Sequence, residues 1–299
     1  MAQKILILKG GLSSEREVSL VSGSGIAQAL KDTNYDIIEY DYKNSFDLIK
    51  TIKENNIDVV FNALHGGFGE DGTIPALLDL LETPYTHSGY RASCLAMDKE
   101  ITKDICKKIN IKCAKSIKIK ADQINEIDFD FPYVIKPVSE GSSIGVFIIK
   151  SEKDLSTVSY DNDMDLMVEE FIEGRELTTS VLDGKALAVT ELTTDEKFYD
   201  YQAKYTDGLT KHILPADIST DIENLAKEYA IKIHNELECN FISRSDFRYN
   251  EKDGLVFLEI NTHPGMTPLS LVPEQAEYCG ISYKELCINL IKNAKYRKA

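Results

Sequence analysis

The chain has 299 residues, of which 43% are hydrophobic and 28% charged, and its formal net charge at pH 7 is −15. This composition is ordinary for a soluble globular protein, and the acidic balance argues against nucleic acid as a partner, because phosphate contacts require clustered Lys and Arg. No apolar run approaches the length of a membrane span, and the first residues lack a signal-peptide pattern. The six scattered cysteines form no C-x-x-C motif, which indicates reduced thiols in a cytoplasmic protein.

The first part of the chain alternates apolar runs with amphipathic segments. This pattern predicts strands at 5–9, 35–40 and 57–64, and helices from about 15 to 30, 46–54 and 73–81. Ser13 or Ser14 is the predicted N-cap of the first helix. Because βαβ alternation produces a parallel sheet, ligands are expected at the carboxyl ends of the strands, where Gly10-Gly11 and His65-Gly66-Gly67 stand.

The glycines at 67, 69 and 72 match a dinucleotide fingerprint, but two features argue against that function. Glu70 and Asp71 make the loop acidic, and no Asp or Glu stands about 20 residues beyond Gly72 to bind a ribose. No P-loop motif is present either, which excludes a P-loop NTPase.

The central region begins with a helix predicted from Lys99 to about Ile109, followed by strands of antiparallel type at 131–136, 146–150 and 166–172. The Gly/Ser-rich turn between the first two is either a structural hairpin loop or a flexible flap that cradles phosphate. Lys136, at the end of the strand that enters the turn, favours the flap, since a lysine beside an N–H-rich loop suits a nucleotide phosphate.

The last third of the chain starts with strands at 177–182 and 186–192. A polar loop from Thr206 to about Pro215 follows, which is either a mobile lid or a disordered connection. Helices are predicted at 221–237 and 283–294. His87, His212 and His234 have no predicted partner, whereas His65 and His263 lie within suspected ligand loops.

Between these two helices, Asp253-Gly254 joins two strands in a hairpin. Arg244 and Asp246 share one face of the first strand, and counting from the turn places Asp246 roughly opposite Glu259. Asn261 is expected beside Glu259. The opposite, apolar face of the second strand is predicted to carry Val256, Leu258 and Ile260.

Two adjacent carboxylates repel, so this face is either a hydrated acidic hairpin or a divalent-cation site. Oxygen ligands completed by water and substrate phosphates are the usual arrangement for Mg²⁺ at nucleotide sites. The segment after the second strand favours the metal site, because Pro264-Gly265 leaves backbone N–H groups that a ligand can approach.

Taken together, these motifs resemble the D-alanine–D-alanine ligases of the ATP-grasp superfamily. The matching segments are 10–19, 65–72, 97–99, 136–137, 141–145, 198–205, 244–246 and 259–267, in family order along the chain. Two positions depart from the family pattern. Ser245 stands where an aliphatic residue is usual, and Glu170-Phe171 where Lys-Trp is frequent.

The resemblance implies a mixed α/β and α+β fold: an ATP-grasp fold preceded by an N-terminal, Rossmann-like α/β domain with a parallel sheet. Three domains are expected, covering residues 1–97 with the first D-alanine site, 98–180 with the phosphate flap, and 181–299 with the metal site, the lid and the second D-alanine site. It also implies a cytoplasmic homodimer that acts on D-alanine and ATP, without nucleic acid or membrane as partners.

Roles for individual residues also follow from the resemblance alone. The residues expected to bind ATP are Lys99, Lys136, Ser142, Ser143, Glu169, Glu170, Ile172, Glu176 and Lys204. Asp246, Glu259 and Asn261 would hold two Mg²⁺ ions, for which Mn²⁺ can substitute. The residues expected to bind D-alanine or act in catalysis are Glu15, His65, Ser142, Tyr205, Arg244, Gly265, Ser270 and Leu271.

The implied reaction proceeds through a D-alanyl phosphate, which the amine of a second D-alanine attacks. Glu15, Ser142 and Tyr205 would form a hydrogen-bonded triad over the closed site. The alternatives are a ligase that joins D-alanine to D-lactate or D-serine, and a non-catalytic ATP-binding regulatory module. The Lys204-Tyr205 pair argues against D-lactate, and the presence of Lys136, Arg244, Asp246, Glu259 and Asn261 argues against the regulatory module.

Overall fold

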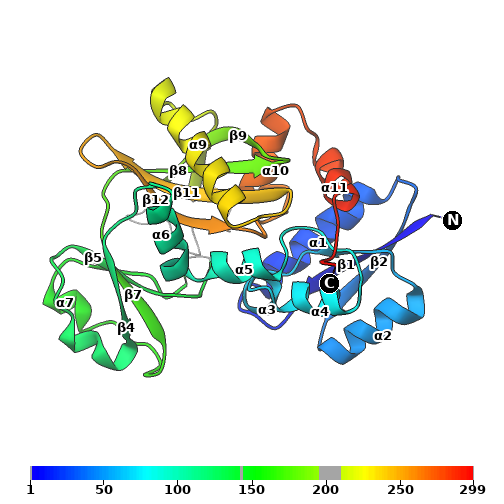
Figure 1. Cartoon of the computed structure of the whole chain (residues 1–299), viewed down its shortest axis with the longest axis horizontal. Helices are drawn as coiled ribbons and strands as arrows, with labels where there is room; N and C mark the ends of the chain where they lie inside the picture. The colour runs from blue at the N-terminus through cyan, green and yellow to red at the C-terminus, as the bar shows by residue number, and fades with distance from the viewer. Residues whose placement is uncertain (1, 142–143, 195–209, 299) are drawn as a thin grey trace.

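A computed structural model describes residues 2–141, 144–194 and 210–298. Within these ranges the strands form three sheets with the orders β2-β1-β3, β4-β7-β5-β6 and β10-β9-β8-β11-β12. In Figure 1 the four-stranded sheet lies on the left, the three-stranded sheet on the right and the five-stranded sheet above and between them. No helix in the described ranges is long and apolar enough to span a membrane.

The N-terminal sheet is parallel, as the βαβ alternation predicts. Its strands are β1 (Gln3–Gly10), β2 (Tyr35–Tyr42) and β3 (Val59–Asn62), with β1 in the middle. Side-chain alternation along β1 divides the core: Ile5 and Ile7 pack with α1 (Arg16–Leu30), and Leu6 and Leu8 pack with α2 (Ser45–Asn55) and α4 (Thr73–Leu80). Both glycine-containing loops lie at the carboxyl ends of these strands, as expected.

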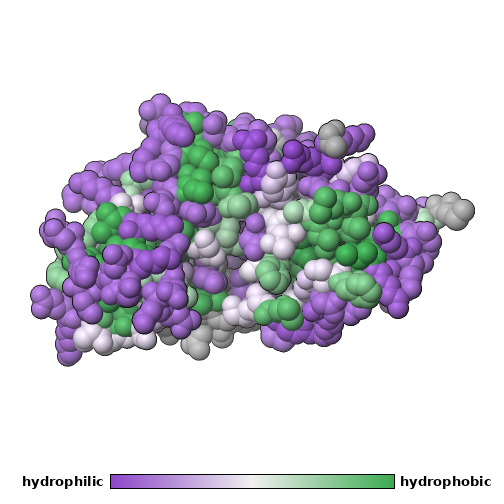
Figure 2. Space-filling model, turned by 60° about the horizontal axis from the view of Figure 1, so that its bottom comes forward, coloured by the Kyte–Doolittle hydropathy of each residue, from purple (hydrophilic) through white to green (hydrophobic). Residues whose placement is uncertain are grey.

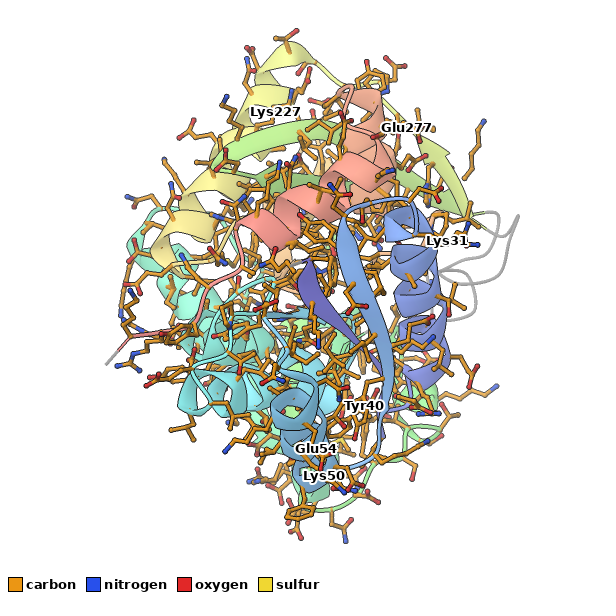
Figure 3. The ribbon with its side chains drawn as sticks, turned by 90° about the vertical axis from the view of Figure 1, so that its right-hand side faces the viewer. Lys31, Tyr40, Lys50, Glu54, Lys227 and Glu277 are labelled. Atoms are coloured by element: carbon orange, nitrogen blue, oxygen red, sulfur yellow. The ribbon has the colours of Figure 1, made fainter. Side chains whose placement is uncertain are left out.

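The last helix, α11 (Tyr283–Lys292), also belongs to this core although it is distant in sequence. Leu286, Leu290 and Ile291 pack with Ile26 and Leu30 of α1, and Figure 3 shows α11 beside α1. The N-terminal and C-terminal parts of the chain therefore share one hydrophobic core.

The central sheet is antiparallel. Its strands are β4 (Ser116–Lys120), β5 (Tyr133–Pro137), β6 (Phe147–Ile149) and β7 (Asp165–Glu170), and the short helices η1 (Ala121–Glu126) and α7 (Glu152–Leu155) connect them. The predicted flap is the β5–β6 connection. The helices α5 (Tyr90–Met97) and α6 (Lys99–Lys108) precede this sheet and pack on the C-terminal sheet through Ala96 and Cys106.

The C-terminal sheet is built from β8 (Arg175–Leu182), β9 (Lys185–Thr194), β10 (Thr210–Ile213), β11 (Ile242–Asn250) and β12 (Gly254–Asn261). The helix α9 (Thr220–Glu236) packs on it through Ala226, Ala230 and Ile233. The helix α10 (Leu271–Tyr278) follows β12. The predicted pairing of Asp246 with Glu259 is confirmed by the strand register.

The prediction of one apolar face on the second hairpin strand is wrong. After Asp246–Glu259 the register shifts at a β-bulge, so Phe247 pairs with Phe257 and Leu258 has no partner in the ladder. The extra residue moves Phe257 onto the face of Ile260, in the core below α9. Leu258 instead lines the same cleft as Glu259.

Three other local expectations differ from the structure. The N-cap of α1 is Glu15, while the Ser13 hydroxyl donates to the carbonyl of His65, a bond between the loop after β1 and the loop after β3. Part of the expected polar loop before Pro215 is the strand β10. The helices α5 and α10 and the strand β4 were not predicted, because their apolar runs are short and weakly periodic.

Two buried serines on β11 predict opposite changes in stability. Ser245 is 1% exposed, and among the described residues its hydroxyl has no hydrogen-bond partner. Ser245→Ala should therefore raise the free energy of unfolding by about 1 kcal/mol. The matched control is Ser243→Ala. It removes the hydroxyl that lies 2.7 Å from His234 Nδ1 and should lower the free energy of unfolding by about 1 kcal/mol. Urea unfolding of both variants is the measurement, and a loss of stability in S245A would contradict the expectation.

Candidate active site

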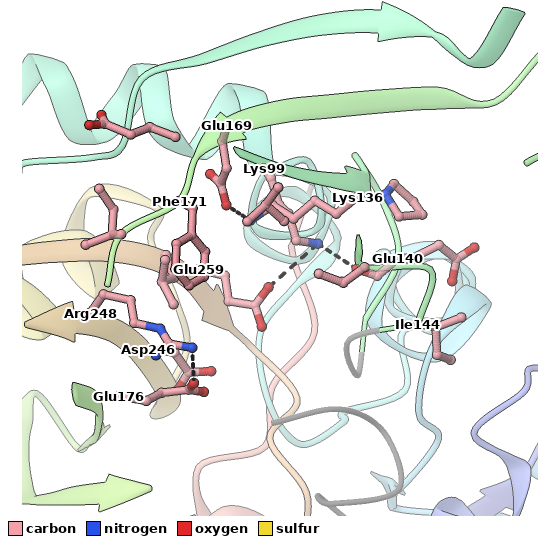
Figure 4. A pocket seen from close by; sticks show the side chains of 16 residues that line it. Lys99, Lys136, Glu140, Ile144, Glu169, Phe171, Glu176, Asp246, Arg248 and Glu259 are labelled. Atoms are coloured by element: carbon pink, nitrogen blue, oxygen red, sulfur yellow. Dashed lines mark hydrogen bonds and ion pairs between the residues drawn. The ribbon is translucent and has the colours of Figure 1, made fainter. Parts of the chain in front are cut away.

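A cleft between the central and C-terminal sheets collects many of the charged residues predicted for the site (Figure 4). Lys99 of α6, Lys136 of β5 and Glu169 of β7 enter it from one side, and Glu176, Asp246 and Glu259 enter from the strands of the C-terminal sheet. Its remaining lining residues are Val134, Pro137, Glu140, Ile144, Val146, Glu170, Phe171, Ile172, Arg248 and Leu258.

The inner wall of the cleft holds three buried charges. Glu169 is 4% exposed and accepts from Lys103 at 2.8 Å on one oxygen and from Lys136 on the other. Burial by itself raises the pKa of Glu169, but the charges of Lys136 and Lys103 outweigh it and hold the pKa at about 2. The carboxylate is therefore ionised at neutral pH, and the three groups together carry one positive charge.

Lys99 lies beside Glu140, a residue of the flap. It is the first residue of α6, whose N-cap Asp98 accepts from the backbone N–H groups of Glu100 and Ile101. Its Nζ donates to the carbonyl of Glu140 at 2.6 Å and stands 3.7 Å from Glu259 Oε2. A lysine held against a flap carbonyl and a hairpin carboxylate links the two sides of the cleft.

The hairpin presents its two carboxylates side by side, surrounded by donors. Asp246 accepts from Arg244 Nε at 2.9 Å and Nη2 at 2.8 Å, and from the Thr178 hydroxyl at 2.6 Å. Glu259 lies directly across the strand pair. Asn261 is the last residue of β12, two residues after Glu259, and its side-chain oxygen accepts from the backbone N–H of His263 at 2.8 Å.

These oxygen donors suit a hard divalent cation. Within the described ranges no group of three or more His, Cys, Asp or Glu side chains is placed to hold a metal. One or two carboxylates are the usual protein contribution to a Mg²⁺ site that binds a nucleotide, where phosphates and water supply the remaining ligands, and Asp246 with Glu259 fits that description.

At the other end of the cleft, Glu176 pairs with Arg248 at 2.9 Å. Glu170, Phe171 and Ile172 line this end, next to the strand connection from β7 to β8. An acidic side chain beside an apolar wall suits a ribose and a base, the arrangement expected for Glu176 and the Glu169–Ile172 backbone.

Glu15 and His65 come together at the carboxyl ends of β1 and β3. Glu15 is 4% and His65 6% exposed. His65 Nδ1 lies 3.0 Å from Glu70 Oε1, and its Nε2 lies 3.1 Å from the Ser22 hydroxyl. A methyl group on Gly141 of the flap would lie 3.4 Å from Glu15 Oε2, so the flap reaches the N-terminal loops.

Gly265, Ser270 and Leu271 are also brought together. Ser270 is the N-cap of α10 and Leu271 its first residue. The Ser270 hydroxyl accepts from the backbone N–H of Thr267 at 3.0 Å and lies so near Gly265 that an added Cβ there would be 2.9 Å away. The N-terminus of α10 presents backbone N–H groups, which attract a carboxylate.

Four predicted site residues, Ser142, Ser143, Lys204 and Tyr205, lie outside the described residues. The structure adds Lys103 and Arg248, which the sequence reasoning missed. Lys103 stands one helical turn after Lys99, and Arg248 stands two residues after Asp246 on the same strand. Helical and strand periodicity could have flagged both as neighbours of predicted residues.

The histidines divide between the site and the core. His263 is 2% exposed and its ring stacks on His87, with ring centroids 5.0 Å apart. His212, for which no partner was expected, lies with its Nδ1 2.8 Å from Glu274. His234 is buried, 2.7 Å from the Ser243 hydroxyl. Only His65 remains near the loop that Glu15 occupies.

The comparisons with known proteins agree with this geometry. The family model described as the C-terminus of D-ala D-ala ligase matches residues 106–292, and the one described as its N-terminus matches residues 41–88. A D-alanine–D-alanine ligase of Acidiphilium cryptum is 46% identical, covering 99% of both chains. The chain belongs to the D-alanine–D-alanine ligase family.

Other members of the family support the same fold over the whole chain. A D-alanine–D-alanine ligase of Zymomonas mobilis is 47% identical over 97% of this chain and 93% of its own. The Bacillus anthracis D-alanine–D-alanine ligase complexed with ATP has a TM-score of 0.84 at 31% identity, covering 98% of this chain and 97% of its own. The VanG D-Ala:D-Ser ligase of Enterococcus faecalis has a TM-score of 0.82 at 29% identity, covering 98% and 99%. The ATP-grasp fold class predicted from the sequence is therefore confirmed.

The buried histidine stack predicts a loss of stability in acid. Burial, then the charge of His65, lowers the pKa of His87 to about 3, so the folded chain keeps this ring neutral while the unfolded chain protonates near pH 6.5. The contribution of neutral His87 to the free energy of unfolding is fully present above pH 6.5 and is lost as the pH falls toward 3. At pH 5 the loss is about 2 kcal/mol.

His87→Asn should therefore reduce the fall in unfolding free energy between pH 7 and pH 5 by about 2 kcal/mol. Asn suits the site because it tolerates the positive φ of 72° found at residue 87. Urea unfolding at both pH values is the measurement. An undiminished fall in the variant would show that His87 is not the titrating group.

Proposed function

We propose that the chain ligates two D-alanines to D-alanyl-D-alanine with ATP, through a D-alanyl phosphate, for the synthesis of peptidoglycan precursors in the cytoplasm. The observation that carries this proposal is the cleft in which lysines of the central sheet face paired carboxylates of the C-terminal sheet. Membership of the D-alanine–D-alanine ligase family and the ATP complex of the Bacillus anthracis relative support it.

ATP would lie along this cleft. Lys99 and Lys136 would contact its phosphates, together with the flap residues Ser142 and Ser143, and Lys204 would approach the γ-phosphate. The backbone of 169–172 would meet adenine, and Glu176 the ribose hydroxyls. Charge complementarity supports this orientation of ATP. The cationic end of the cleft lies by the flap and suits the phosphates, while the other end has an apolar wall and suits the base.

Asp246, Glu259 and Asn261 would hold two Mg²⁺ ions, or Mn²⁺ in their place. When bound, the metal would neutralise phosphate charge during transfer of the γ-phosphoryl group. Arg244 and Lys99 already contact these carboxylates, so they keep the paired negative charges in place. The remaining role of the chain in the first step is to position the carboxylate of D-alanine in line with the γ-phosphorus.

Glu15 would bind the ammonium group of the first D-alanine, with His65 nearby. Their position supports this role, since Glu15 and His65 follow the carboxyl ends of β1 and β3, where ligands of a parallel sheet bind. The approach of Gly141 to Glu15 supports a triad of Glu15, Ser142 and Tyr205, because Gly141 precedes Ser142 in the sequence.

In the second step, the amine of the second D-alanine would attack the carbonyl carbon of the acyl phosphate, and the C–O bond to phosphate would break as inorganic phosphate leaves. Arg244 and the Gly265 N–H would stabilise the tetrahedral oxyanion. The carboxylate of this D-alanine would bind at the start of α10, to the Ser270 hydroxyl and the Leu271 N–H. The position of both residues at a helix N-terminus supports this, because such ends attract anions.

A homodimer and a division into domains 1–97, 98–180 and 181–299 complete the proposal. Figure 2 shows a hydrophobic patch on the half of the molecule built around the N-terminal sheet. Phe68, of the short helix α3 (Gly67–Glu70), and Leu80 of α4 belong to that half and are 52% and 84% exposed. Exposed apolar surface of this kind supports a contact between copies.

The second candidate is a D-alanine–D-serine ligase, which the likeness to the VanG enzyme keeps in view. The higher identity to the D-alanine–D-alanine ligases favours alanine. The deciding experiment measures phosphate release from ATP and Mg²⁺ with D-alanine, L-alanine, D-alanine plus D-serine, and D-alanine plus D-lactate. Release with D-alanine alone, with the dipeptide found by mass spectrometry, supports the proposal. Release that requires D-serine or D-lactate, or no release at all, contradicts it.

The metal assignment makes a separate prediction. Glu259→Gln removes a negatively charged oxygen ligand and should lower kcat at least a hundredfold at ordinary Mg²⁺ concentration, on the order of 3 kcal/mol of transition-state stabilisation. Glu251→Gln is the matched control, because Glu251 lies exposed in the turn of the same hairpin. Near-normal activity of E259Q would contradict the metal site.

A further inference from the structure

Lys103 is a buried cation that the proposed function does not use. It is 2% exposed and is among the largest fully buried side chains. Its Nζ lies 2.8 Å from Glu169 Oε2 and 3.9 Å from Met167 Sδ. Removing an ammonium group from water costs several kcal/mol, so a lysine at this position needs a compensating benefit.

Pairing with Glu169 alone does not explain it. Lys136 already neutralises the carboxylate, through the oxygen that Lys103 leaves unused. One lysine would balance one carboxylate, whereas the structure buries two lysines around it. The second lysine leaves the cluster of Lys103, Lys136 and Glu169 with a net positive charge. Of the two lysines, Lys136 lines the cleft.

We propose that Lys103 is a positioning residue for the nucleotide: by occupying Glu169 it leaves the charge of Lys136 available to the phosphates of ATP. Without Lys103 the carboxylate and Lys136 form a neutral pair, which holds the Lys136 ammonium group against Glu169. This inference rests on the proposed binding of ATP in the cleft. It concerns only the strength of the phosphate contact, since Lys103 acts through Glu169 Oε2, while Lys136 on the other carboxylate oxygen lines the cleft.

The direct test is Lys103→Met, which keeps the length of the side chain and removes its charge. We expect the KM for ATP to rise roughly tenfold, since one positive charge near the phosphates is lost, with little change in the KM for D-alanine. Lys103→Arg should stay near wild type. Lys107→Met is the matched control, because Lys107 lies on the same helix but is exposed and pairs with Asp104. Lys103→Gln removes the same charge and serves as the second neutral variant if K103M does not fold.

A double variant separates this role from a structural one. In K103M with Glu169→Gln, the negative charge is removed as well, while the backbone proposed to meet adenine is unchanged. Lys136 is then no longer paired with a carboxylate, so the KM for ATP should return toward wild type. If the three residues served only the stability of the fold, the double variant should show a higher KM for ATP than K103M, because a second stabilising contact is lost. A KM for ATP equal to wild type in K103M or K103Q, or no recovery in the double variant, overturns the inference.

Calorimetric binding of ADP with Mg²⁺ distinguishes this failure from failure of the proposed function. Wild-type chain that binds no ADP contradicts the proposed function and the inference together. If the wild-type chain and K103M bind ADP equally tightly, only the inference is contradicted. Weaker binding by K103M with retained binding by K107M supports it.

Discussion

The cleft depends on balancing like charges in a partly buried space. Asp246 and Glu259 stand opposite one another on the hairpin, and Lys103 and Lys136 share a single carboxylate on the facing sheet. Neither pair would be tolerated alone at low dielectric, since like charges in contact raise the free energy of the folded chain. Arg244 and Lys99 compensate the acidic pair, and Glu169 compensates the lysines. The two sheets are thereby left with complementary surfaces, one rich in oxygen donors and one cationic, which is the arrangement that a metal–nucleotide complex needs on its two sides.

The N-terminal sheet takes part in this site through packing. The helix α11 belongs to the core of the parallel sheet and follows α10 directly, so the N-terminus of α10 and the loops after β1 and β3 are held by one hydrophobic core. The carboxyl ends of β1 and β3 then bring Glu15 and His65 to the tip of the flap, where Gly141 lies close to Glu15. Glycine is also required at Gly66 beside Glu15, because its backbone has a φ of 63° and a ψ of −175°, a conformation that other residues rarely adopt. The groups proposed for the amino-acid substrate thus meet the nucleotide cleft at its flap end.

Much of this arrangement could be predicted from local pattern. The parallel sheet followed from βαβ alternation. Asp246 was placed roughly opposite Glu259, and it pairs with Glu259 because of the bulge, since continuing the register of Phe247 with Phe257 would put it opposite Leu258. Strict alternation of side chains put Arg244 and Asp246 on one face. That same rule failed for Leu258, since the bulge after Asp246 changes the alternation and leaves no mark in the composition. Lys103 was missed for a different reason: helical periodicity makes it a neighbour of Lys99, but its role depends on a carboxylate 66 residues away, which only the packing of α6 near β7 brings into contact. The capping of α1 was predicted one or two residues early, because Ser13 bonds to the neighbouring loop instead.

The central claim is that the cleft activates a carboxylate by transferring to it the γ-phosphoryl group of ATP. The most direct measurement uses D-alanine labelled with ¹⁸O in its carboxylate, with ATP and Mg²⁺, and examines the released phosphate by mass spectrometry. An acyl phosphate carries one carboxylate oxygen to phosphorus, so the account predicts phosphate with one ¹⁸O atom for each dipeptide formed. Unlabelled phosphate accompanying the dipeptide would contradict the account, because ATP would then have been cleaved without phosphorylation of D-alanine.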